Sequence, residues 1–185
     1  MKAAARVAGA LYLSLVPLGF YSLALAPSVY FVPRDAEATI RNIAELQLLF
    51  RTAIASHLIS QVVVVFLALR LYRLFRIVDD DRARLMLVLA LLCGSISFAA
   101  EMSSLAVLRI VDDPRLHPQA MLSLEMQRSG VLLAQVFWGL WMLPLAALVF
   151  ASGFLPKWLA LPVVIASVCS AAASRKSYPA KSLFL

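Results

Sequence analysis

The chain has 185 residues, enough for one domain, and 63% of them are hydrophobic, which gives a mean hydropathy of +0.88. A soluble domain is nearer half apolar, so this composition excludes an ordinary water-soluble core. The formal net charge is +7, but the arginines gather at the ends of apolar segments and form no basic stripe interleaved with aromatic residues, which disfavours a nucleic-acid partner.

Five segments are apolar enough to cross a bilayer, because about 20 helical residues span the hydrocarbon core. They cover residues 7–26, 50–71, 85–108, 131–150 and 155–173. The sequence therefore predicts an all-α, polytopic transmembrane helix bundle of five spans with one or two interfacial helices. Residues 1–173 form its single domain, and the polar, basic tail at 174–185 is expected to be disordered.

The first span follows Lys2 and Arg6 and contains Ala24-Leu25-Ala26, which resembles a signal-peptidase site. The apolar run is longer than the core of a signal peptide, and Pro27 would follow the cut. We therefore expect an uncleaved first helix.

Two shorter helices are expected outside the spans. Residues 27–49 are too polar to cross the membrane, and Asp35 is a residue type that caps helices. Apolar residues then recur at helical spacing and predict one buried face, which comprises Ile40, Ile43, Ala44 and Leu48. A second helix is expected over residues 118–130, and it continues toward the fourth span.

Arginines surround the turn between the second and third spans, in which residues 79–81 are aspartates. They are Arg70, Arg73, Arg76, Arg82 and Arg84. Such a turn is typical of the cytoplasmic side and predicts a cytoplasmic N-terminus, although the basic tail argues for the reverse. A sixth helix lost beyond the tail would remove that conflict. The same arginines are a candidate contact for anionic membrane lipids.

Other chemistry has little support in the sequence. Cys93 and Cys169 lie inside predicted spans, and we interpret both as packing residues. His57 and His117 lack the additional ligands of a zinc site. Phosphate-binding glycine loops and nucleophile elbows are absent from the sequence. We therefore expect no metal, no cofactor and no enzymatic activity.

A few polar residues fall inside the spans, where a charged group costs about 2.5–3.5 kcal/mol and needs a partner or a purpose. They are His57, Gln61, Glu101 and Gln135. His57 and Gln61 lie four residues apart on one helix face. Counted by helical rise, His57, Glu101 and Gln135 lie roughly 6–8 Å to the outer side of their helix centres. The sequence thus allows a buried polar cluster that either fixes helix packing or binds a proton or ligand.

Several short motifs carry a family resemblance. They are Ala5–Leu13, Pro33–Ala36, Leu69–Leu74, Gly139–Leu145 and Ser152–Pro156. On these motifs the chain, from about Ala5 to Ile165, resembles a bacterial family of multi-pass membrane proteins, domain of unknown function 4386. The resemblance implies a helical bundle in the bacterial inner membrane. It implies no activity and no catalytic residue. The family usually continues into a further helix, and this chain departs from the family pattern there.

The sequence leaves two function classes open. The first is a non-enzymatic membrane protein that acts by helix packing or by binding a protein partner whose nature the sequence does not reveal. The alternative is a small transporter or sensor that uses an intramembrane site at Glu101 and His57.

Overall fold

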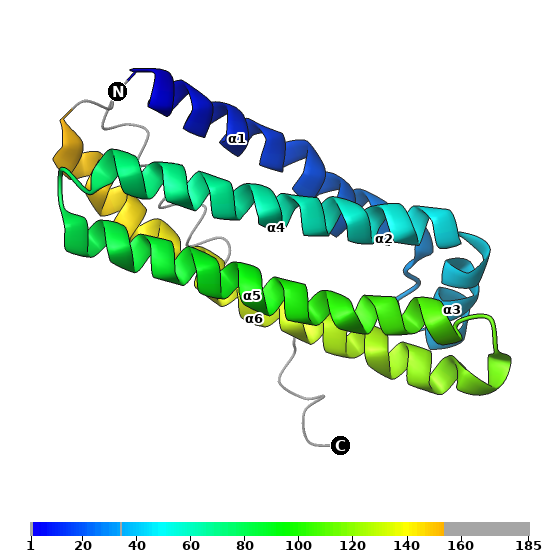
Figure 1. Ribbon diagram of the computed structural model, residues 1–185. Helices are drawn as coiled ribbons and strands as arrows, with labels where there is room; N and C mark the ends of the chain where they lie inside the picture. Colours follow the sequence, from blue (N-terminus) through cyan, green and yellow to red (C-terminus); the bar gives the residue numbers. More distant parts are fainter. Residues whose placement is uncertain (1, 34, 154–185) are drawn as a thin grey trace. The chain divides into compact units, whose positions relative to one another are not determined.

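The computed structural model describes residues 2–33 and 35–153, and within them every regular element is a helix. The elements are drawn in Figure 1 and are α1 (Lys2–Phe20), η1 (Tyr21–Leu25), α2 (Ala26–Tyr30), α3 (Ala36–Glu45), α4 (Gln47–Phe75), α5 (Asp80–Ile110), η2 (Pro114–Leu116) and α6 (His117–Ser152). The all-α prediction therefore agrees with the part of the chain that the structure describes.

Four helical runs are long and apolar enough to cross a membrane. They are Arg6–Tyr30, Gln47–Phe75, Asp80–Ile110 and Pro114–Ser152. Each corresponds to one of the first four predicted spans but is longer, because the polar residues at the ends of an apolar segment continue the same helix. The fifth predicted span, 155–173, and the tail at 174–185 lie outside the described residues.

The first run is not a uniform α-helix. Pro17 lies inside α1, and the π-helix η1 follows, where the Ala26 N–H donates to the Tyr21 carbonyl five residues back. A π-turn is wider than an α-turn and occurs in proteins mostly as a single turn, frequently at functional sites. In the most apolar 18-residue window of this run, 11% of the residues are buried against the rest of the described chain, compared with 33–44% in the other three runs.

The short helix α3 begins where the sequence predicted, because the Asp35 carboxylate accepts a hydrogen bond from the Ala38 N–H at 2.8 Å. Ile40 and Ile43 are buried, as their spacing predicted. The prediction for Leu48 is wrong, since its side chain is 76% exposed. The reason is that α3 ends at Glu45 and α4 starts at Gln47, which breaks the periodicity of the apolar face.

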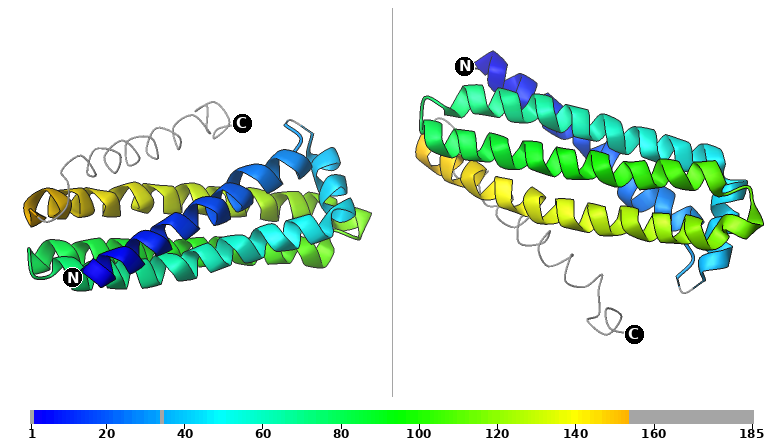
Figure 2. Two further views of the ribbon diagram at one scale, coloured as in Figure 1. Left: turned by 90° about the horizontal axis from the view of Figure 1, so that it is seen from above. Right: turned by 60° about the horizontal axis from the view of Figure 1, so that its bottom comes forward.

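The chain divides into two compact units, and the long helices α4, α5 and α6 contribute residues to both. Figure 2 shows these helices from two further directions. Among the described residues, unit 1 comprises 2–8, 65–95 and 132–153. Its core is apolar and is centred on Trp141, whose ring meets that of Trp138 edge to face at 5.6 Å. Cys93 is buried, and its thiol donates to the Ala134 carbonyl at 3.3 Å, which fits a packing role.

Unit 2 comprises residues 9–64 and 96–131. Its apolar core joins α2, α3, α4, α5 and α6, with an edge-to-face contact between Tyr30 and Phe50 at 5.3 Å. At the end of unit 2 where α4 begins, the Gln47 amide donates to Asp112 at 2.6 Å. Unit 2 also contains the polar residues described next.

Candidate functional site

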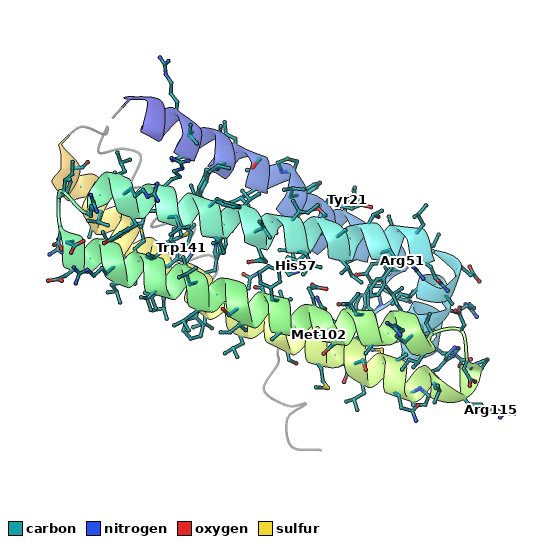
Figure 3. All side chains as sticks on the ribbon, viewed as in Figure 1. Tyr21, Arg51, His57, Met102, Arg115 and Trp141 are labelled. Carbon is teal, nitrogen blue, oxygen red and sulfur yellow. The ribbon has the colours of Figure 1, made fainter. Side chains whose placement is uncertain are left out.

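His57 and Glu101 form a buried polar pair in unit 2. Nδ1 of His57 on α4 lies 2.5 Å from Oε1 of Glu101 on α5, and their side chains are only 6% and 4% exposed. His57 lies ten residues inside α4 and Glu101 nine residues before the end of α5, about 15 Å and 14 Å from those helix ends. Figure 3 shows His57 on the side of α4 that faces α5. The pair is therefore well inside two apolar helices, where polar groups need partners.

A third helix contributes to the pair through Gln127. Its side-chain amide on α6 donates to Oε1 of Glu101 at 3.3 Å, so Oε1 has two partners. The close approach of α6 to α5 depends on Gly130, because a Cβ added there would lie 2.6 Å from the Cβ of Ala100. A glycine one turn after Gln127 thus allows that residue to reach the carboxylate of the neighbouring helix.

The second oxygen of Glu101 is different. Oε2 is buried and has no hydrogen-bond partner among the described residues. Glu101 lines a small cavity of about 20 Å³, which is room for about one water. Other polar groups at this cavity are Ser22, Tyr30, His57, Ser104 and Gln127. A buried carboxylate oxygen without a partner costs free energy, and a bound water or a proton would remove that cost.

The broken first run supplies one side of the cavity. Ser22 and Leu23, both from η1, are among the lining residues. The Leu18 carbonyl accepts a hydrogen bond from the Ser22 hydroxyl at 2.9 Å and another from the Ser56 hydroxyl of α4 at 3.1 Å. Tyr21 and Thr52 also share a hydrogen bond of 2.6 Å. Hydroxyl groups therefore join the irregular part of the first run to the helix that carries His57.

The four polar residues that the sequence singled out are distributed over both units. His57 and Glu101 are in direct contact. Gln61 is buried in unit 2, and its Oε1 has no hydrogen-bond partner within the described residues. Gln135 belongs to unit 1 and is partly buried. Sequence reasoning missed Gln127, because residues 118–130 were expected to lie outside the fourth span, in a helix that continues toward it.

The predicted arginine turn lies in unit 1, between α4 and α5. Two of its five arginines pair with aspartates of the same turn. Arg82 Nε lies 3.2 Å from Asp79 Oδ2, and Arg84 pairs with Asp80. All four side chains are substantially exposed, so each ion pair contributes little to stability.

Metal binding finds no support in residues 2–33 and 35–153, where no group of three His, Cys, Asp or Glu side chains is placed to hold an ion. His117 begins α6, and one of its ring nitrogens lies 3.3 Å from the Val111 carbonyl. Cys169 lies outside the described residues.

Comparison with known proteins identifies the family. Residues 7–183 match the family described as domain of unknown function 4386. The chain belongs to this family. The match extends past Ile165, the end of the stretch over which the sequence motifs indicated the resemblance. Neither the curated proteins nor the solved structures contain a match to the chain.

Proposed function

We propose that this family member is a non-enzymatic protein of the bacterial inner membrane in which the His57–Glu101 pair binds a proton. Histidine is the side chain that ordinarily changes charge between about pH 5 and pH 8, and a carboxylate inside a membrane helix is by default a candidate functional group. With a neutral imidazole and an ionised carboxylate, the pair carries one net negative charge in an apolar surrounding. One added proton neutralises that charge.

The observation that carries the proposal is the unequal environment of the two Glu101 oxygens. Oε1 has two partners. Oε2 is buried beside a cavity for one water and has no partner in residues 2–33 and 35–153. A pair that served packing alone would be most stable with both oxygens satisfied. Oε2 is the atom at which the arriving proton would bond.

The other ionisable groups near the pair are few. Tyr30 of α2 lines the cavity, and the Arg128 guanidinium of α6 lies 4.3 Å from the centre of the Phe31 ring. The Tyr21 hydroxyl of η1 bonds Thr52, and no charged residue of α3 lines the cavity. Among the described residues that line the cavity, Glu101 is therefore the one carboxylate.

The size of the cavity beside Glu101 supports a proton as the ligand of this site and disfavours an organic molecule there. A space of about 20 Å³ admits a water but no organic molecule, whose sites usually occupy several hundred Å³. Helix packing by the same residues is the competing function, and the experiment below separates the two.

Infrared spectroscopy of the full chain in nanodiscs tests the proposal. When the pH is lowered from about 8 to about 5, we expect a carboxylic-acid carbonyl band to appear as the proton binds to Glu101. The Glu101→Gln variant should lose that band, and Glu125→Gln, an exposed position on α6, should keep it.

Circular dichroism and gel filtration establish that both variants are folded. If Glu101→Gln does not fold, ¹³C NMR of the Glu101 carboxyl carbon in the unaltered protein gives the same information. An unchanged band in folded Glu101→Gln, or a Glu101 carboxyl carbon with one protonation state across this range, would overturn the proposal.

We further propose that the N-terminus is cytoplasmic, which places the arginine-rich turn on the same side. This orientation is supported by the five arginines of the turn and by Lys2 and Arg6 near the start of α1. A single cysteine introduced between residues 76 and 79 should react with a membrane-impermeant thiol reagent only after the cells are opened. Labelling in intact cells from the periplasmic side would contradict the orientation.

A further inference from the structure

The five arginines of the turn between α4 and α5 fall into two sets. Arg82 and Arg84 have carboxylate partners, Asp79 and Asp80. The Asp80 carboxylate also accepts a hydrogen bond from the Tyr72 hydroxyl at 3.2 Å, which holds the second pair in place. The positive charge of these two arginines is therefore largely balanced within the turn.

The other three, Arg70, Arg73 and Arg76, are exposed and form no ion pair with any residue of the described chain. Asp81 is the remaining carboxylate of the turn, and it lies in the first turn of α5, where the positive end of the helix dipole favours a negative charge. Pairing within the turn thus leaves a net positive charge on the α4 side.

The three unpaired arginines lie close together at the end of an apolar helix. Arg70 and Arg73 are three residues apart and so are neighbours on the α4 surface, and Arg76 directly follows the last helical residue, Phe75. Large apolar side chains at this end are exposed as well, Leu69 at 37% and Ile77 at 68%. Charged guanidinium groups beside exposed apolar side chains fit the boundary between lipid headgroups and acyl chains.

From this arrangement we propose that Arg70, Arg73 and Arg76 form a binding site for the phosphate headgroups of anionic phospholipids. A guanidinium presents a planar fork of N–H donors that matches two phosphate oxygens, and such charge-assisted pairs are stronger than neutral hydrogen bonds. Leu69, which precedes Arg70 in the helix, contacts the acyl chains below the headgroup. A soluble phosphate offers no apolar part to this side chain, so the site prefers a lipid. The site is separate from the His57–Glu101 pair and does not depend on the function proposed for it.

The structure supplies a matched pair of variants. Arg70→Gln/Arg73→Gln/Arg76→Gln removes the unpaired arginines, and Arg82→Gln/Arg84→Gln removes the paired ones. Each full-length protein is purified in detergent and reconstituted into nanodiscs that contain phosphatidylglycerol and phosphatidylcholine. Native mass spectrometry then gives the ratio of the two lipids that remain bound to the protein. Because detergent reconstitution presents the same lipids to both faces, any role of the arginines in setting orientation during biosynthesis does not enter this measurement.

We expect the unaltered protein to retain phosphatidylglycerol preferentially. Each unpaired arginine removed should lower the preference by roughly fivefold, which corresponds to about 1 kcal/mol near a membrane surface. The triple variant should therefore lose the preference, and Arg82→Gln/Arg84→Gln should retain most of it. The single variant Arg73→Gln gives a smaller loss in the same assay if the triple variant does not fold.

Three results would overturn the proposal. The triple variant, or Arg73→Gln in its place, retains the full preference of the unaltered protein. The paired variant loses as much preference as the triple variant. Inorganic phosphate, added in equal molar amount to the anionic lipid, displaces that lipid completely, which would indicate a site for soluble anions.

Discussion

The two compact units bury different kinds of side chain. Among the described residues of unit 1, no charged, amide, imidazole or hydroxyl side chain is buried, and the buried polar groups there are the Cys93 thiol and the Trp141 indole N–H. Unit 2 buries nine: Ser22, Thr39, Ser56, His57, Ser60, Gln61, Ser97, Glu101 and Ser104. The same long helices α4 and α5 contribute to both cores, so the difference lies in particular positions and not in the average hydropathy of a helix.

This contrast shows where the chain depends on specific partners. An apolar core needs only complementary shapes, and it tolerates volume-conserving apolar substitutions. A buried polar network needs every donor and acceptor satisfied, because the low dielectric makes an unpaired group costly. Unit 2 is therefore the part of the molecule in which single substitutions have the largest consequences, and the two predictions that follow test this difference.

The largest effect is expected from removing one member of the buried pair. His57→Leu leaves the Glu101 carboxylate without its buried partner and should lower the free energy of unfolding by roughly 3–5 kcal/mol. The double variant His57→Leu/Glu101→Leu converts the site to the apolar type of unit 1 and should unfold within about 1 kcal/mol of the unaltered protein. Titration with sodium dodecyl sulfate in mixed micelles measures both values. If the double variant is as unstable as the single one, the contrast between the two cores does not arise from the pair.

A smaller effect is expected from glycines, one in each unit. Gly130→Ala in unit 2 places a methyl group 2.6 Å from the Cβ of Ala100 and should cost about 1–3 kcal/mol, because α5 and α6 must separate. Gly94→Ala in unit 1 has nothing within 4 Å and should be neutral or stabilising by up to about 1 kcal/mol. The same unfolding titration compares them. Equal losses of unfolding free energy at the two positions would mean that the close approach of α5 and α6 does not limit the size of the side chain at position 130.

The helices themselves could be predicted because their signals are local. Long apolar segments gave the four described runs, and Asp35 with the spacing of Ile40 and Ile43 gave α3. Helix ends were harder, since the residues before Phe50 and over 117–130 are polar enough to lie outside a lipid core and yet are helical. Hydropathy reports where lipid contacts the chain, and hydrogen bonding alone determines where the helix stops.

The site was predicted in part. His57 and Glu101 were identifiable because ionisable residues are rare in apolar helices. Gln127 was missed because its contact with Glu101 depends on the close approach of α6 to α5 at Gly130. The distance between two helices produces no repeating pattern of residues from which it could be predicted. The π-helix η1 was missed for a related reason: its register is set by a hydrogen bond five residues back, for which Tyr21–Leu25 carries no distinctive composition.

Because of the wide turn at Tyr21–Leu25, the number of residues in the first run, and not only their type, determines which way its side chains face. A π-turn accommodates about one residue more than an α-turn, and one residue corresponds to about 100° of rotation around a helix. Deleting a single amino acid there would restore regular winding and rotate everything before it by that angle. Leu18, whose carbonyl now meets Ser56, would then face a different direction, and its lipid-facing neighbours with it.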